Sequence, residues 1–284
     1  MVFVNNYAVF VPKVIETFLG NILFGEIERP SFTPFRSPML LDESCILSNS
    51  LDLTPLALYS THLQGKFKRL YTSRTDGYDF NRIYHHIQGY SGPTMLLIKT
   101  RNTVNHGVNI FGAFSTSRWK DSNKFYGDGG NFLFTLYPTL RIYRSTSSST
   151  NYQYLNIRSY NLKHGLAFGG TEQSFRLFIP DSLERCEARP YDIVYEKGAL
   201  IANNKVDEDN VYFDIDNIEF WCCGADDVIK KGLQGQVADR ANRDELIRKA
   251  QSCDKAAFFN NDFDKEFLLG NTMAHRNEVQ KDRL

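Results

Sequence analysis

Adjacent histidines and adjacent cysteines are the first residues to test for chemistry. His85 and His86 fall in a predicted helix, where neighbouring side chains point about 100° apart, which is poor geometry for chelating one metal ion. Cys222 and Cys223 fall in a predicted strand, where neighbouring side chains face opposite sides and a vicinal disulfide would strain the backbone. The pattern therefore predicts no metal site, and it predicts one buried and one exposed thiol.

Cys186 has the strongest electrostatic case for a reactive thiol. Arg185 precedes it, and Arg189 follows shortly after. Nearby positive charge favours the thiolate, which is the form that reacts with oxidants. A redox-sensor thiol at Cys186 is therefore a hypothesis for the structure to test.

Several other patterns resemble known sites but lack a required part. Residues 126–130, Tyr-Gly-Asp-Gly-Gly, are not followed by Lys-Ser/Thr, and a strand is predicted next, so we expect a β-turn rather than a phosphate loop. The acidic stretches 207–209 and 214–217 lack the glycine and terminal Glu of a calcium loop. The GxSxG elbow of many hydrolases is missing. The sequence predicts no catalytic residue, no cofactor and no metal site, and hence a protein that is not an enzyme.

The composition indicates a folded protein without an excess of charge. The 284 residues contain 33 Lys plus Arg and 33 Asp plus Glu, so the zero net charge creates no field that favours nucleic acid or an anionic membrane. Aromatic residues make up 14% of the chain, which suits a β-rich body. The 5 cysteines contain no CxxC pair, which argues against a disulfide framework or zinc ribbon and for a reducing compartment.

The sequence indicates neither a secretory signal nor a membrane span. The apolar start, residues 1–11, has no basic region and is broken by Asn5 and Asn6. Nowhere does an apolar stretch reach the roughly 20 residues that a span requires. We expect a soluble, cytoplasmic protein.

Residues 1–43 are predicted to form a helix and a linker. Apolar residues recur at helical spacing after Pro12 and end near Gly25, which predicts an amphipathic helix. These residues are Val14, Ile15, Phe18, Leu19, Ile22 and Leu23. The stripe could bind a membrane surface or a partner groove, but its polar face has few basic residues, so packing on the chain's own domain is favoured. Residues 28–38 contain three prolines and indicate an extended linker.

Residues 44–224 show the short elements of a β-rich domain. Helices are predicted over 44–60, where Pro55 interrupts or restarts the helix, and over 80–88, with a strand at 67–73 between them. Beyond these, short apolar runs recur about every ten residues between Gly, Asn, Ser and Asp clusters, which favours a mainly β fold, a two-sheet antiparallel β-sandwich with peripheral short helices. The predicted strands are residues 94–100, 108–115, 131–136, 140–143, 155–157, 166–168, 175–179, 211–213 and 218–222.

Residues 225–284 are predicted to form a helical extension. Acidic residues precede basic ones at i,i+4 spacing, as in Asp244 and Arg248, which supports a solvated helix. Large apolar groups then concentrate in an otherwise polar tail and are the candidate residues for docking on the body or on a partner. They are Phe258, Phe259, Phe263 and Phe267.

Several motifs of the central region together resemble the TLDc domain family in order and spacing. They are Gly92-Pro93 with the strand that follows, Phe111-Gly112-Ala113-Phe114, Trp119, Phe125-Tyr126-Gly127, Gly169-Gly170 with the strand that follows, and Ile218-Glu219-Phe220-Trp221. The resemblance covers roughly residues 44–224. Most of these residues, the glycines, Pro93, Trp119, Glu219 and Trp221 among them, explain a fold rather than a reaction. Two departures stand out, because the family's glycine run is shortened to Gly169-Gly170 and its Thr-Phe-Asn-Asn region is replaced by residues 189–195.

The resemblance implies an interaction module. Members of the family are associated with protection against oxidative stress, and several bind the vacuolar proton-pumping ATPase and affect its assembly or activity. By this resemblance the chain would dock on a large cytosolic assembly, with vacuolar-type ATPase subunits as partners, and would be recruited to an organelle surface or a cytoskeletal assembly. The extension after residue 230 resembles helical extensions that contact a second surface of the partner.

Two other functions stay open at this point. A constitutive structural subunit of a cytoskeletal or ciliary complex would use the aromatic tail between its neighbours. A thiol-based oxidant scavenger would need a reactive cysteine, for which Cys186 and Cys222 are the residues to vary.

Overall fold

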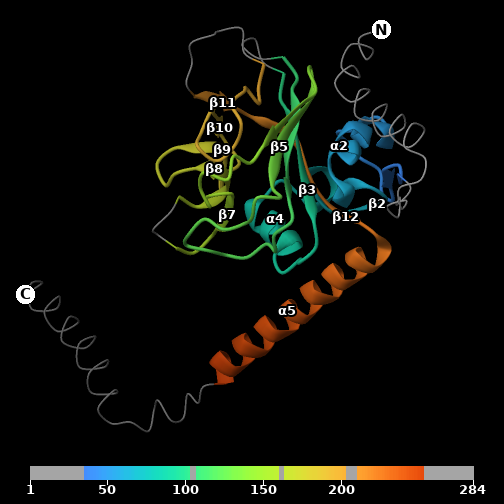
Figure 1. The fold of residues 1–284 in the computed structure, drawn as a ribbon. Helices are drawn as coiled ribbons and strands as arrows, with labels where there is room; N and C mark the ends of the chain where they lie inside the picture. The colour runs from blue at the N-terminus through green and yellow to red at the C-terminus, as the bar shows by residue number, and fades with distance from the viewer. Residues whose placement is uncertain (1–34, 103–106, 160–162, 203–209, 253–284) are drawn as a thin grey trace, which may run out of the picture. The chain divides into compact units, whose positions relative to one another are not determined.

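Two facing β-sheets dominate residues 35–102, 107–159, 163–202 and 210–252, which the computed structural model describes (Figure 1). The larger sheet has the strand order β1-β2-β12-β3-β4-β5-β6, and the smaller has the order β11-β10-β9-β8-β7. Neighbouring strands are antiparallel except β1 and β2. The predicted mainly β, two-sheet sandwich is confirmed.

The strands are short and close in bounds to the predicted runs. The larger sheet contains β1 (Met39–Leu40), β2 (Lys66–Thr72), β3 (Thr94–Thr100), β4 (Ile110–Ser115), β5 (Phe132–Tyr137), β6 (Arg141–Arg144) and β12 (Ile215–Gly224). The smaller sheet contains β7 (Gln153–Asn156), β8 (Gly165–Gly170), β9 (Phe175–Pro180), β10 (Cys186–Ala188) and β11 (Val211–Phe213). β1 and β10 have no predicted counterpart.

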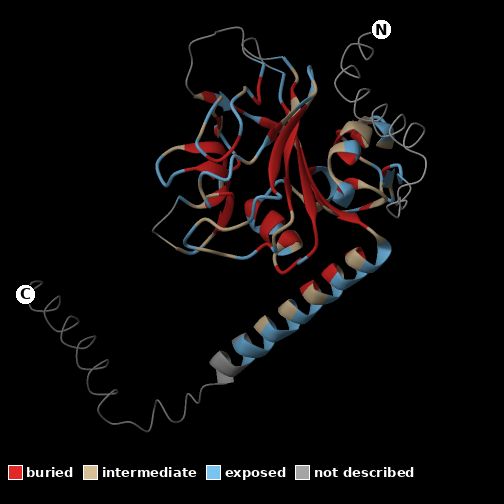
Figure 2. Cartoon of the chain, in the orientation of Figure 1, coloured by how far each residue is buried: buried red, intermediate tan, exposed pale blue. Residues whose placement is uncertain are grey.

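Successive side chains of a strand point to opposite faces, and in the larger sheet apolar side chains form a core on each face. In β3, Leu96 and Ile98 belong to the core between the two sheets, whereas Met95 and Leu97 belong to a second core on the outer face. α4 (Phe80–Ile87) lies where a helix was predicted and packs its apolar side on the inter-sheet core. Asp79 caps it by accepting hydrogen bonds from the Asn81 and Arg82 N–H groups. Figure 2 shows buried positions filling the strands of both sheets.

Short helices cover part of the outer face, and they differ from the helix predicted over residues 44–60. They are η2 (Ser50–Leu53), α2 (Thr54–Tyr59) and η3 (Thr61–Leu63). Pro55 lies in the first turn of α2 and so restarts the helix. Residues 44–49 are not helical, because the Ser44 hydroxyl accepts hydrogen bonds from the Ile46 and Leu47 N–H groups at 3.1 and 2.9 Å and so competes with helical bonding.

The long sheet edges are covered by other parts of the chain. Along β6, Thr146 N donates to Val194 O at 2.8 Å and Glu196 N donates to Arg144 O at 2.9 Å. Along β7, Tyr126 pairs with Gln153 as an isolated bridge. Some of the backbone groups that would face solvent at these edges are therefore paired within the chain.

α5 (Asp226–Ser252) follows β12 directly. Residues up to Gly235 belong to the same compact unit as the sandwich, and residues from Gln236 belong to a second unit. Throughout the described ranges, no helix combines the length and apolar character that crossing a membrane requires. The predicted helix at residues 12–25 lies outside the described residues, and the division of the chain into 1–43, 44–224 and 225–284 stays a prediction.

Candidate interaction surface

The adjacent cysteines lie where both faces of β12 are covered. Cys223 belongs to the outer core, and Cys222 packs with Tyr90 and with Ile229 of α5. Both thiols are buried, so the prediction that one of them is exposed is wrong. Burial raises the pKa of each thiol, which disfavours the reactive thiolate.

Cys186 is not an activated thiol. Its side chain lies in the core between the sheets, and burial raises its pKa, with the negative charge of Asp214 adding to the effect. The Arg185 guanidinium is not directed at the sulfur but lies over the Tyr212 ring, 5.0 Å from its centroid. The hypothesis of a low-pKa sensor at Cys186 is therefore wrong, because the strand that carries it turns the thiol inward.

The histidines and the glycine-rich segment have structural contacts. His86 Nδ1 lies 2.7 Å from the Leu70 carbonyl oxygen, and the His85 ring packs edge-on against Tyr84. In residues 126–130, Asp128 accepts a hydrogen bond from Gly130 N at 2.8 Å within a turn, as predicted. Among the residues that the structure describes, no three His, Cys, Asp or Glu side chains cluster to hold a metal ion.

Glu219 is a buried carboxylate that fastens the segment before η2 to the sheet. Ser44 Oγ donates to Glu219 at 2.7 Å, Cys45 N donates at 2.6 Å, and Trp221 Nε1 donates at 3.0 Å. Both carboxylate oxygens are therefore occupied by donors of the chain itself. Glu219 and Trp221 position residues 44–47 and leave no room for a substrate at this carboxylate.

Arg176, the second residue of the apolar strand β9, is a fully buried charged side chain. Its guanidinium donates to the carbonyl oxygens of Arg189, Glu196 and Gly198, and its Nε lies 3.7 Å from Asp192 Oδ1. Burial lowers the pKa of Arg176 to about 10 and raises that of Asp192, so the loss of hydration outweighs the attraction within the pair. The pair holds residues 189–198 against the end of the smaller sheet.

The two departures from the family pattern meet at Asp192. Asp192 Oδ2 accepts hydrogen bonds from Gly170 N at 2.9 Å and from Val194 N at 3.1 Å. Gly169 has a φ of +65°, and a Cβ atom there would lie 2.4 Å from the same oxygen. The shortened glycine turn and the replaced loop are therefore one structural unit, since the glycines give the Asp192 carboxylate its place.

We call residues 189–198 the partner loop. Tyr191 is 53% exposed and Ile193 is 58% exposed, although the backbone between them is fixed by Asp192 and Arg176. Lys197 Nζ lies 6.0 Å from the centroid of the Tyr191 ring. Apolar side chains on an ordered, exposed loop are typical of a surface that binds another protein.

Two of the predicted motif residues bring distant segments together around Tyr90. A Cβ atom at Gly92 would lie 2.6 Å from the Tyr90 hydroxyl, and one at Gly232 of α5 would lie 2.5 Å from the Tyr90 ring. Next to Gly92, the Pro93 carbonyl oxygen accepts a hydrogen bond from Cys223 N at 3.1 Å. This cluster attaches the start of α5 to the sandwich.

The other motif residues also have structural roles. Trp119 Nε1 donates to Thr94 Oγ1 at 2.8 Å, and its ring packs edge-on against Phe168 and Phe220 between the sheets. A Cβ atom at Gly112 would lie 1.9 Å from the Leu96 carbonyl oxygen, and one at Gly127 would lie 2.8 Å from Tyr152 Cβ. Phe258, Phe259, Phe263 and Phe267 lie outside the described residues, so their docking role stays a prediction.

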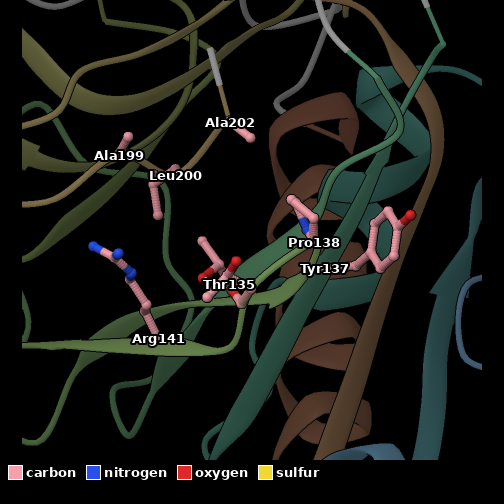
Figure 3. Close-up of a pocket in the computed structure, with 8 residues that line it drawn as sticks. Thr135, Tyr137, Pro138, Arg141, Ala199, Leu200 and Ala202 are labelled. Atoms are coloured by element: carbon pink, nitrogen blue, oxygen red, sulfur yellow. Dashed lines mark hydrogen bonds between the residues drawn. The ribbon is translucent and has the colours of Figure 1, made fainter. Parts of the chain in front are cut away.

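A pocket lies between the end of β5 and residues 199–202 (Figure 3). Its lining consists of Thr135, Tyr137, Pro138, Thr139, Arg141, Ala199, Leu200 and Ala202. Arg141 is the one charged side chain in this lining, so the pocket does not bring together the acid and base of a catalytic pair.

Sequence reasoning missed Arg176 and Asp192 as organising residues. A signal was present, because an arginine inside the apolar run Phe-Arg-Leu-Phe-Ile of residues 175–179 must be paired if that run is a buried strand. Asp192 gave no comparable signal, because acidic residues are common in loops.

The fold and the surface together define a β-sandwich whose motif residues position loops and helices rather than reacting groups. The model of the TLDc domain family matches residues 41–224. The chain therefore belongs to the TLDc domain family.

The relatives are longer than the part of them that matches this chain. MTOR-associated protein MEAK7 of Danio rerio is 29% identical over 219 residues, which cover 76% of this chain and 46% of that protein. MTOR-associated protein MEAK7 of Homo sapiens is 25% identical over 228 residues, with coverages of 78% and 46%. Oxidation resistance protein 1 of Bos taurus is 28% identical over 114 residues, with coverages of 40% and 12%. The chain spans less than half the length of these relatives.

Proposed function

We propose that the chain is a non-catalytic module that binds and regulates a large cytosolic assembly through the partner loop. The observation that carries the proposal is the exposure of Tyr191 and Ile193 on a backbone fixed by the buried Arg176–Asp192 pair. A fixed loop loses little conformational entropy on binding, so its apolar side chains can contribute most of their contact energy to affinity.

The non-catalytic part of the proposal rests on what the potentially reactive groups contact. Cys186, Cys222 and Cys223 are buried with raised pKa values, and the Glu219 carboxylate is occupied by three donors of the chain. These contacts support a conformational rather than a chemical activity, and they disfavour a scavenger based on these three thiols.

The vacuolar-type ATPase is the partner to test first, because the family resemblance links TLDc proteins to this pump. The names of two relatives agree with a role in complexes and in oxidative stress, since one is called mTOR-associated and the other an oxidation resistance protein. The oxidative-stress role would follow from regulation of the partner.

The test is native copurification with a matched pair of variants. Ile193→Asp places a charge on the partner loop, and Leu51→Asp places the same charge on η2 at nearly the same exposure, 58% against 59%. We expect vacuolar ATPase subunits to be recovered with the wild type and with Leu51→Asp. Recovery with Ile193→Asp should fall by about tenfold, the effect of losing about 1.4 kcal/mol at an apolar anchor.

Two results would contradict the proposal. Pump subunits that copurify equally with both variants would show that the partner loop is not the contact. Pump subunits absent even from the wild-type preparation would remove this partner. A chain ending at Ser252 keeps the start of α5 on the sandwich and tests separately whether residues 258–267 contribute.

A further inference from the structure

The outer face of the larger sheet is only partly covered. The helices η2, α2 and η3 lie over one part of it, and Tyr59 at the end of α2 packs edge-on against Phe132 of β5, with ring centroids 4.9 Å apart. Beyond this contact lies a set of apolar side chains that we call the β4–β6 patch. It consists of Ile110, Leu136, Tyr137, Leu140 and Ile142.

The patch continues the outer core toward the far ends of β4, β5 and β6. Ile110, Leu136, Leu140 and Ile142 are partly exposed and pack on the outer core, and Tyr137 is 53% exposed. Tyr137 is the register partner of Ile110, so it shares the outer face. Tyr137 also contributes to the lining of the pocket, but Figure 3 shows its ring turned away from Leu200 and Arg141.

We propose that residues 12–25 of this chain bind the β4–β6 patch as an amphipathic helix and complete the outer core. The sequence of this segment has an apolar stripe at Val14, Ile15, Phe18, Leu19, Ile22 and Leu23. A stripe of this width needs an apolar surface to pack against, and a sheet face whose aromatic and aliphatic side chains are half covered supplies one. This contact is separate from the partner loop.

The linker is long enough for the contact. β1, where residues 39–40 pair, and β5 are five positions apart in the larger sheet, which corresponds to about 24 Å at the usual strand spacing. Residues 26–34, which lie between the stripe and the first described residue, contain Pro30 and Pro34, and an extended proline-rich segment of this length spans about 28 Å. This length is comparable to the distance across the sheet, so the linker can bring the C-terminal end of residues 12–25 onto the sheet face.

Carbene footprinting of the full chain tests the proposal. The measured quantity is labelling of residues 136–142 relative to residues 191–193, because Tyr137 and Tyr191 are equally exposed at 53%. Phe18→Asp disrupts the apolar stripe, and Thr17→Asp adds the same charge on the polar face as a matched control. We expect Phe18→Asp, and deletion of residues 1–27, to raise the relative labelling by about threefold, because a packed helix excludes the reagent from the side chains that it covers. Thr17→Asp should leave the ratio unchanged.

Three results of the footprinting would overturn the proposal. Equal ratios in the wild type and Phe18→Asp would overturn the proposal, as would protection that disappears on dilution, which would assign the patch to a second copy. Protection that arises only when a partner protein is added would also overturn it. If the deleted chain folds poorly, the point variant remains decisive, and adding a peptide of residues 10–27 to the deleted chain should restore protection.

Discussion

Arg176 carries a positive charge into the interior of the smaller sheet, and Asp192 is its acidic partner. Because burial disfavours the charged form of each group, the pair adds little net stability over an apolar pair of the same shape. Its effect is to specify one geometry, since Arg176 binds three carbonyl oxygens of the partner loop and Asp192 binds backbone N–H groups of the loop and the glycine turn.

Removing one member of this pair should be strongly destabilising. Asp192→Ala leaves the Arg176 charge buried without its counterion, so we expect the free energy of unfolding to fall by about 3–5 kcal/mol. Asp181→Ala is the control, because Asp181 is exposed and pairs with His164 at 3.7 Å, and its loss should change stability by less than about 1 kcal/mol. Urea unfolding of both variants measures the difference. Similar stability losses would show that the pair has no special role.

At the scale of elements, α5 is attached to the sandwich through a ring held between two glycines. The Tyr90 side chain is fully buried, with Gly92 against its hydroxyl and Gly232 against its ring. Both positions require glycine because the Tyr90 side chain approaches their backbone closely. Backbone conformation is not the reason, since neither glycine has a φ in the left-handed region. The start of α5 is thus part of the packed body, even though the TLDc match ends at residue 224.

Gly232→Ala tests this attachment, because the helix preference of alanine and the contact with Tyr90 change stability in opposite directions. Alanine normally stabilises a helix interior by about 0.5–1 kcal/mol relative to glycine, but here the added Cβ would meet an enclosed ring, so we expect a loss of about 1–3 kcal/mol. Gly235→Ala on the same helix meets only Ser91 Oγ at 3.3 Å and should be neutral or stabilising. Thermal unfolding of the two variants gives the answer. A stabilised Gly232→Ala variant would contradict the packing described for Tyr90.

Across the whole molecule, buried thiols should make stability depend on alkaline pH. Burial raises the folded-state pKa of Cys186, Cys222 and Cys223, so the folded state keeps protons that the unfolded state releases above about pH 8.5. The stabilisation is fully present below that pH and is lost as pH rises toward the folded-state values. Each thiol contributes a slope of up to about 1.4 kcal/mol per pH unit.

Urea unfolding at pH values from about 7.5 to 9.5 measures this slope before free tyrosines ionise near pH 10. A Cys186→Ala variant should show a shallower decline than the wild type. An unchanged free energy of unfolding across the range would mean that the thiols are not buried in solution.

The sequence predicted the sandwich and most strands because alternation and glycine-rich turns are local signals. It predicted α4 from the helical spacing of its apolar residues, and it located Trp119 and the motif glycines, but it did not identify Asp79 as the residue that caps α4. It did not predict the burial of Cys222, because the residues that cover it, Tyr90 and Ile229, come from distant segments. The sequence also did not predict the hydrogen bond from Gly170 N to Asp192, because the two residues are 22 positions apart.

The covered edges of the sheets limit how this protein can be recognised. Parts of the β6 and β7 edges are paired by other segments of the chain, and the other two edge strands, β1 and β11, are only 2 and 3 residues long, so the described sheets offer a partner peptide little template for adding a strand. Recognition then depends on side-chain identity rather than on backbone hydrogen bonding, which any sequence can supply. Short and partly paired edges of this kind also disfavour the edge-to-edge stacking that leads β-proteins to aggregate.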